Sequence, residues 1–332
     1  MRHDFVAGAR NAVRVCLGIT GRDRVALVFD EGTAEIAEAI DQEALGTGAE
    51  VGRWKMEDHV ERPASDLPRS VADEIRALRP TASIFMGESK RGELAYRQPL
   101  LHLLVEELHC RHGHMPGVDE ALMTDGMAVD YEEVYRVTRQ VYDVARAAAR
   151  IEVSTRAGTD LKATFSPALR WIPCDGRYHE QGHWGNLPEG ETFTAPLNVD
   201  GVIAGEEMGD WFTHKYGVFE APVRLRVRAS RLAGVETDNE ELALDIAAYM
   251  SQHANSNRVG EFAIGTNVGL KRIVGNFLQD EKFPGVHMAF GDPYGFETGA
   301  DWECPTHVDV LASHADVTVD GRKIMEQGRI LL

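Results

Sequence analysis

The stretch Arg24-Val-Ala-Leu-Val-Phe29 predicts the fold of the first half of the chain. A short run of apolar residues is typical of a strand that is buried on both faces of a parallel sheet. Thr33 then offers a helix N-cap, and apolar side chains recur every four residues until Gly46, a common helix end. Glu50 to Met56 is the next strand candidate. Strand, helix and strand in this order predict a βαβ unit.

The alternation of strand and helix continues through the first half of the chain. Ser70 to Leu78 predicts a helix, and Ala82 to Met86 predicts a strand. Gly92 to Leu108 predicts a longer helix that is interrupted at Pro99. We therefore expect residues 1–148 to form an α/β domain with a parallel sheet.

The second half of the chain has a different pattern. Tyr131 to Arg150 carries one apolar stripe at three- and four-residue steps, which predicts a helix that links the two halves. After it come short β-rich runs, and Asp320-Gly321 predicts the turn of a hairpin. Two helices are expected among these runs, from near Thr237 to about Gln252 and from Leu270 to Leu278. These patterns predict an α+β domain over residues 149–332.

Composition places the chain among globular proteins. At 332 residues it can bury about three quarters of its unfolded surface, and this length usually forms two domains. No apolar run approaches the ~18 residues that a membrane span needs, and the N-terminus lacks the apolar stretch of a signal peptide. The four cysteines are scattered without CxxC spacing, which argues against a disulfide framework. We expect a cytoplasmic protein with no membrane partner.

The formal net charge of −18 argues against nucleic-acid binding. Binding to phosphates depends on clustered Lys and Arg side chains that neutralise them, and acidic residues outnumber basic ones here by 53 to 35. We therefore expect no nucleic-acid partner.

Five side chains of metal-ligand type lie in short, strand-like apolar runs of the second half. His307 and Asp309 are two apart in Thr306-His-Val-Asp-Val310, and a strand points alternate side chains to one face. A carboxylate buried in so apolar a run is costly unless a cation or hydrogen bonds compensate it. The other three residues are Glu191, Glu261 and His287. Together the five predict a metal centre.

Carboxylates and imidazoles can hold two divalent ions with one carboxylate, here Glu191 or Asp309, bridging them. Zn, Co, Mn and Fe all suit such ligands. Two ions of this kind activate water and polarise a carbonyl, so amide hydrolysis is the reaction that this centre serves most naturally. Tyr294, seven residues after His287, is placed to donate a hydrogen bond to a developing oxyanion.

Four motifs carry a family resemblance. They are Asn186-Leu-Pro-Glu-Gly-Glu191-Thr-Phe-Thr, Gly260-Glu261-Phe-Ala, His287-Met-Ala-Phe-Gly with Tyr294, and Thr306-His307-Val-Asp309. In this order they resemble the thermophilic-type metallo-aminopeptidases, aminopeptidase T and its relatives. The resemblance implies an aminopeptidase T-like fold, a homodimer, and hydrolysis of the N-terminal amide of a peptide or of a small amide. It also implies a dinuclear metal centre with the ligands Glu191, Glu261, His287, His307 and Asp309, and Tyr294 as the catalytic phenol.

A second function is compatible with the same fold. Ring-cleaving dioxygenases that act on dihydroxypyridines share it and hold one Fe(II) with two histidines and a carboxylate. His287, His307 and Asp309 could supply such a site. Glu191 and Glu261 favour the hydrolase, because they add the carboxylates that a second metal needs.

One further group has alternating ligand-type residues. Cys110, His112 and His114 lie in His109-Cys-Arg-His-Gly-His, but no fourth ligand follows at a familiar spacing. We interpret them as loop residues.

Overall fold

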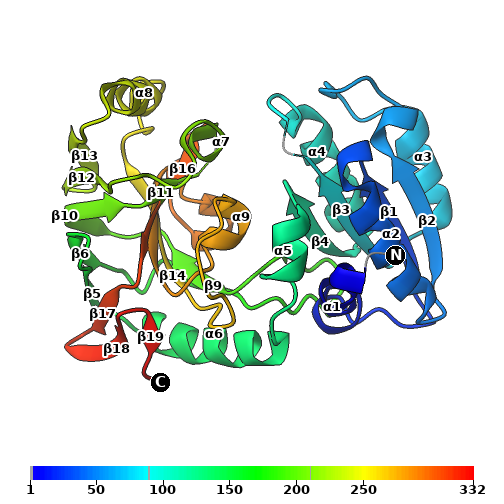
Figure 1. Ribbon diagram of the computed structural model, residues 1–332, viewed down its shortest axis with the longest axis horizontal. Helices are drawn as coiled ribbons and strands as arrows, with labels where there is room; N and C mark the ends of the chain where they lie inside the picture. The colour runs from blue at the N-terminus through cyan, green and yellow to red at the C-terminus, as the bar shows by residue number, and fades with distance from the viewer. Residues whose placement is uncertain (1–2, 89, 210) are drawn as a thin grey trace. The chain divides into compact units, whose positions relative to one another are not determined.

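The computed structural model describes residues 3–88, 90–209 and 211–332. They form two compact units (Figure 1). The first unit contains the chain up to residue 132 together with residues 176–189. The second unit contains residues 133–175 and residues 190 onward.

The first unit is built on a five-stranded sheet with the order β2-β1-β3-β4-β8, in which all neighbours are parallel. This confirms the predicted parallel sheet. The central strands are almost fully buried, which explains their continuous apolar runs. The strands are β1 (Arg24–Phe29), β2 (Glu50–Lys55), β3 (Ala82–Gly87), β4 (Arg111–Pro116) and β8 (Trp184–Asn186).

The helices of the first unit follow the predicted alternation. Helix α2 begins one residue after Thr33, but the side chain that caps this turn is Asp30, which accepts a hydrogen bond from the Thr33 amide at 3.0 Å. The α-helices are α1 (Val6–Arg10), α2 (Ala34–Leu45), α3 (Arg69–Leu78), α4 (Leu94–Leu101) and α5 (Glu120–Thr124). Short 3₁₀ turns cover His3–Phe5, Glu31–Thr33 and Met56–Asp58, and π-helical turns cover Asn11–Cys16 and His102–Glu107. The predicted long helix is thus divided after Leu101, two residues beyond Pro99.

His112 and His114 correct the interpretation of their segment as a loop, because both are buried on β4. Ser83 Oγ lies 2.8 Å from His112 Nδ1, and His112 Nε2 lies 3.2 Å from His114 Nδ1. These polar atoms therefore satisfy one another inside the sheet. Burial lowers the pKa of His112 to about 3, so the ring is neutral.

The second unit contains two antiparallel sheets that share one apolar core. Their orders are β13-β12-β10-β6-β5-β17-β18-β19 and β11-β16-β15-β14-β9-β7. Side chains such as Leu161 and Ile203 from the first sheet pack in the same cluster as Phe262 and Met288 from the second. The larger sheet has the strands β5 (Arg150–Ser154), β6 (Asp160–Thr164), β10 (Asn198–Gly205), β12 (Val223–Arg228), β13 (Arg231–Glu236), β17 (Asp316–Val319), β18 (Arg322–Glu326) and β19 (Arg329–Ile330). The smaller has β7 (Ile172–Cys174), β9 (Glu191–Thr194), β11 (Glu207–Met208), β14 (Val259–Gly265), β15 (Gly285–Gly291) and β16 (His307–Ser313).

The helices of the second unit are α6 (Tyr131–Ala145, mostly in this unit), α7 (Trp211–Tyr216), α8 (Glu240–Met250), α9 (Phe277–Asp280) and α10 (Gly295–Thr298). Helix α8 begins later than predicted, because Asn239 caps it by accepting a hydrogen bond from the Leu242 amide at 3.0 Å. No described helix is both long and apolar enough to cross a membrane.

The helix predicted over Leu270–Leu278 is wrong for most of its length, since only α9 is helical there. The carboxylate of Asp280 accepts hydrogen bonds from the amides of Val274, Gly275 and Asn276. A side chain that takes up these amides competes with helical hydrogen bonding.

The two units divide the chain differently from the predicted ranges 1–148 and 149–332. Val137 and Val141 of α6 belong to the core of the second unit, so this helix is part of that unit and not a link alone. Strand β8 pairs with β4, so residues 176–189 return to the first sheet. The predicted ranges remain a proposal for independently folding domains.

Candidate metal centre

The six-stranded sheet places all five predicted ligands on one face. Residues that face each other across antiparallel strands point to the same side, and so do residues two apart. Glu261 pairs with Ala289, which pairs in turn with Asp309. His287 and His307 lie two residues from Ala289 and Asp309, and Glu191 pairs with Gly265, four residues after Glu261. The register of four strands thus aligns the five side chains.

The other face of the same strands packs into the apolar core. Phe262, Val286, Met288, Val308 and Val310 alternate with the ligand-type residues and are all fully buried in the shared core cluster. A shift of one residue in any of these strands would exchange the two faces. The core therefore fixes the register that presents the polar side chains.

The five side chains meet in a continuous series of contacts. His287 Nε2 lies 3.2 Å from Glu191 Oε2 and 3.4 Å from Glu261 Oε1. His307 Nε2 lies 3.7 Å from Glu261 Oε2 and 3.3 Å from Asp309 Oδ2. The structure therefore brings together every residue that the sequence predicted as a ligand; their binding of metal remains a prediction.

Two groups in this cluster have the spacing of a metal site. Glu261, His307 and Asp309 each offer a ligand atom, and these atoms lie within 4.8 Å of one another. Glu281, His287 and Asp309 form a second group by the same measure. Asp309 belongs to both groups.

Glu281 and Lys282 were not identified from the sequence. They follow α9, and Lys282 Nζ lies 2.6 Å from Glu191 Oε1 and 2.7 Å from Glu281 Oε1. The Lys282 side chain is only 1% exposed. In the sequence, Asp280-Glu-Lys282 resembles an ordinary charged surface turn, and the one available signal is its position directly before the His287 strand.

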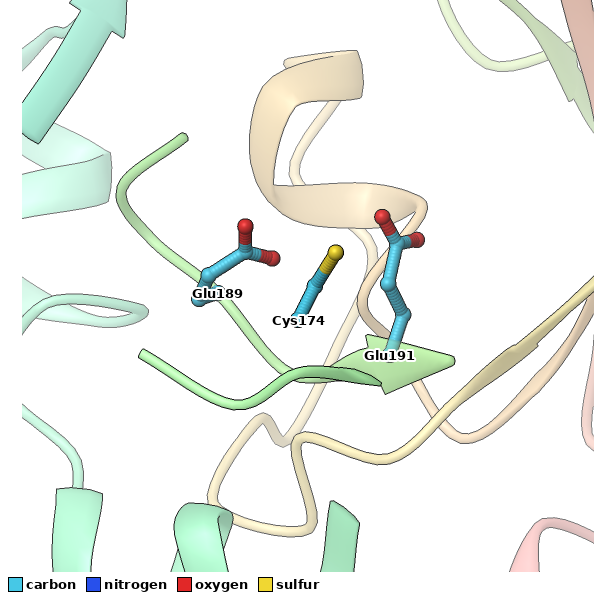
Figure 2. Close-up of side chains that lie close together, drawn as sticks. All are labelled: Cys174, Glu189 and Glu191. Atoms are coloured by element: carbon cyan, nitrogen blue, oxygen red, sulfur yellow. The ribbon is translucent and has the colours of Figure 1, made fainter. Parts of the chain in front are cut away.

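Cys174 is a third residue that the sequence did not connect with the centre. It pairs with Glu191 across β7 and β9, and its Sγ lies within 4.8 Å of a Glu191 carboxylate oxygen. Figure 2 shows these two side chains together with Glu189, two residues upstream of Glu191. Glu189 belongs to the first unit, where its carboxylate accepts a hydrogen bond from the Tyr178 hydroxyl at 2.8 Å. Cysteine spacing alone gave no indication of the Cys174–Glu191 pair.

The orientation of His307 suits a metal ligand. Its Nδ1 lies 3.0 Å from the backbone carbonyl oxygen of Asp292, so Nδ1–H donates to that carbonyl. This hydrogen bond directs the opposite ring nitrogen, Nε2, at Glu261 and Asp309. Histidine ligands in metalloproteins are usually held in this way.

The electrostatics of the cluster favour cations. Burial would lower the pKa of His307, but Asp309 and Glu261 outweigh it and raise that pKa to about 10. Burial opposes ionisation of Glu191, yet Lys282 and His287 lower its pKa to about 2. Burial raises the pKa of Glu281 to about 8 and also raises that of Glu261, so Glu191 and Asp309 are the carboxylates whose ionisation the neighbouring charges favour. Oxygen and nitrogen donors of this kind fit Zn, Co, Mn or Fe(II).

Tyr294 lies beside the cluster, as predicted from its distance to His287. Its ring centroid is 4.6 Å from that of His307 and 5.8 Å from that of Phe193. Desolvation by the surrounding protein and the charges of Glu261 and Asp309 raise the pKa of the phenol, which therefore stays protonated. The residue as a whole is 41% exposed and lines a cavity of about 640 Å³.

The comparisons with known proteins agree with this site. Residues 130–328, more than half of the chain and including every residue of the cluster, match the thermophilic metalloprotease (M29) family. The chain belongs to this family. The family uses divalent metals, which agrees with the ligand groups found here. No curated protein sequence gives a significant match.

Two solved structures share the whole fold of this M29 member. Wild-type AmpT from Thermus thermophilus has 17% identity and a TM-score of 0.71, with 100% of both chains covered. The 2,5-dihydroxypyridine dioxygenase from Pseudomonas putida KT2440 has 13% identity and a TM-score of 0.70, with 98% of this chain and 96% of that chain covered. The expected aminopeptidase T-like fold is confirmed. At these identities the likeness establishes the fold and not the activity.

Proposed function

We propose that this M29 member is a metal-dependent aminopeptidase that hydrolyses the N-terminal amide of peptides or of a small amide. The observation that carries the proposal is the convergence of Glu191, Glu261, His287, His307 and Asp309 on one face of the sheet, beside the protonated phenol of Tyr294. Membership in a metalloprotease family supports the reaction class.

In this proposal Glu261, His307 and Asp309 hold a divalent metal. When bound, the metal would polarise the scissile carbonyl of the substrate and lower the pKa of a bound water. The hydrogen bond from His307 to the Asp292 carbonyl keeps the imidazole in its ligand orientation. Tyr294 O–H donates a hydrogen bond to the oxyanion that forms on the substrate. The sequence predicts two ions. Asp309 belongs to both ligand groups, and Lys282 contacts Glu281 of the second group.

The surroundings of Tyr294 suit a substrate with a free amino group. Acidic and aromatic residues line the cavity beside it, and they are Asp292, Phe296, Glu297, Asp301, Trp302 and Glu303. Carboxylates around a cavity attract a protonated amine and repel a carboxylate terminus. This environment favours an amino-terminal substrate over a carboxy-terminal one.

A second candidate is an Fe(II)-dependent dioxygenase that cleaves a hydroxylated pyridine or a similar aromatic ring. The shared fold with the dihydroxypyridine dioxygenase supports it. His287, His307 and Asp309 would be the iron ligands, as expected from the sequence. The hydrolase remains the better proposal, because the family match is to a metalloprotease and Glu191 and Glu261 both face the centre.

One experiment separates the two functions. Metal-free protein is reconstituted with Zn, Co, Mn or Fe(II) and assayed with aminoacyl anilides and, under oxygen monitoring, with dihydroxypyridines. Anilide cleavage that depends on added metal supports the aminopeptidase. Oxygen uptake with Fe(II) and a dihydroxypyridine, without anilide cleavage, would replace it by the dioxygenase.

N-blocked anilides are the matched control substrates in this assay. An aminopeptidase cleaves them far more slowly than the free-amine forms, whereas equal cleavage would contradict specificity for the amino terminus. The cytoplasmic location and the homodimer expected from the sequence also remain proposals, to be tested by cell fractionation and by light scattering.

A further inference from the structure

Lys282 is an unusual neighbour for a metal centre, because it brings a positive charge into a cluster of metal ligands. Its ammonium group lies within ion-pair distance of two carboxylates, at 2.6 Å from Glu191 Oε1 and 2.7 Å from Glu281 Oε1. The side chain is 1% exposed, so the protein buries this charge completely. A buried charge persists only where partners compensate it, and here the partners are the ligand-type residues themselves.

The second ligand group is the one that Lys282 contacts. Glu281 belongs to the group with His287 and Asp309. Its Oε1 forms an ion pair with Lys282 Nζ at 2.7 Å. The first group, Glu261, His307 and Asp309, has no contact with this ammonium among the described ion pairs. One group is therefore open to a metal, while the other already faces a cation.

An ammonium and a divalent ion compete for the same carboxylates. Both need an oxygen lone pair at short distance, and like charges a few ångströms apart in a buried site repel strongly. The Lys282 side chain cannot simply rotate into solvent, because its methylene chain and its ammonium group are both buried. Its backbone is also held, since the Lys282 amide donates to Gln279 O at 2.9 Å and its carbonyl accepts from the Asn267 amide at 3.0 Å.

We propose that the Lys282 ammonium occupies the place of a second metal ion, so that this chain binds one divalent metal tightly, at Glu261, His307 and Asp309. This inference rests on the metal centre of the proposed function and sets its stoichiometry at one ion, instead of the two that the sequence predicts. Glu191 and Glu281 are then partners of the ammonium, and Glu191 keeps His287 in place through the contact at 3.2 Å.

The test is the metal stoichiometry of Lys282→Met, which keeps a long side chain and removes the charge. Metal-free wild type and variant are equilibrated with Zn²⁺ or Co²⁺, freed of excess ion, and analysed for metal per chain, with calorimetric titration as a second measure. We expect one equivalent in the wild type and two in K282M, because the freed carboxylates then attract a second ion. Lys282→Arg should keep one equivalent, because it keeps the charge.

Lys323→Met is the matched control. Lys323 also lies between two carboxylates, at 3.1 Å from Asp316 Oδ2 and 3.3 Å from Glu326 Oε1, but it is 42% exposed. K323M should bind one equivalent, as the wild type does. A second equivalent in K323M would show that loss of any such lysine creates a site, and it would overturn the assignment to Lys282.

The outcomes separate this inference from the proposed function. Two tight equivalents in the wild type overturn the inference even if K282M does not fold, and leave the peptidase proposal standing if anilides are cleaved. A single equivalent in folded K282M also overturns it. One equivalent in the wild type and two in K282M, without anilide cleavage, would support the inference while the proposed activity fails. No bound metal in the wild type would overturn both.

Discussion

The histidines of the two units show how surroundings decide what an imidazole can do. His112 and His114 are buried in the parallel sheet of the first unit, where Ser83 is the polar partner and burial lowers the pKa of His112 to about 3. His307 lies in the antiparallel sheet of the second unit, where Asp309 and Glu261 overcome burial and raise its pKa to about 10. Carboxylates, and not histidines alone, therefore mark the site that attracts cations.

The strongest test of this comparison removes a ligand from the acidic cluster. His307→Ala should lower metal-dependent anilide cleavage by more than about 1000-fold, because a metal supplies several kcal/mol of transition-state stabilisation. The measurement is kcat/KM together with metal content. His253→Ala is the matched control, since His253 is exposed in the same unit, and it should match the wild type. Full activity in H307A would remove His307 from the centre.

Tyr294→Phe tests the phenol separately from the metal. We expect kcat to fall about 100-fold, as for the loss of one hydrogen-bond donor to an oxyanion, while the metal content stays at the wild-type value. The ring contacts with His307 and Phe193 do not need the hydroxyl. Steady-state kinetics give kcat, and elemental analysis gives the metal content. An unchanged kcat would show that the hydroxyl has no role in the reaction.

Ser83→Ala tests whether the histidines of the first unit are structural. The substitution removes the partner at 2.8 Å from buried His112 Nδ1, and an unsatisfied buried polar atom costs about 1–3 kcal/mol. We expect a lower free energy of unfolding in urea and an unchanged kcat for anilide cleavage. The exposed Ser65 provides the control S65A, which should stay within about 0.5 kcal/mol of the wild type.

A pH dependence of stability is expected from His112. Its pKa is lowered from 6.5 to about 3 in the folded protein, so between these values the unfolded chain binds more protons. The free energy of unfolding therefore falls as the pH is lowered through this interval, by at most about 1.4 kcal/mol per pH unit. His112→Gln should show a shallower dependence in urea titrations at pH values within the interval. Parallel curves for the two proteins would contradict a buried neutral His112.

The sequence alone was sufficient where the signal was local. Continuous apolar runs such as Arg24–Phe29 predicted the parallel sheet, because strands buried on both faces need apolar residues at every position. The alternation at His307 and Asp309 placed both on one face of a strand, and the order of the four motifs indicated the family that the match over residues 130–328 then showed.

Other features depended on contacts between distant parts of the chain. The helix predicted over Leu270–Leu278 failed because the Asp280 carboxylate takes up the amides that a helix would use. Residues 176–189 belong to the first unit because β8 adds to β4, and a parallel pairing of this kind leaves no mark in either segment alone. His112 and His114 can be buried on a strand because Ser83 on the neighbouring strand contacts His112, and His112 in turn contacts His114.

The sequence by itself determined the types of donor atom at the centre, since the carboxylates and imidazoles lie in segments that alternate as strands do. Only the tertiary structure decided which charges meet there. Glu281 and Lys282 look like surface residues in the sequence, and they join the cluster because the turn after α9 carries them against Glu191, a residue 91 positions away from Lys282. The balance between carboxylates and ammonium, on which the number of bound ions depends, is a property of packing because electrostatic energy follows distance and burial and not order along the chain.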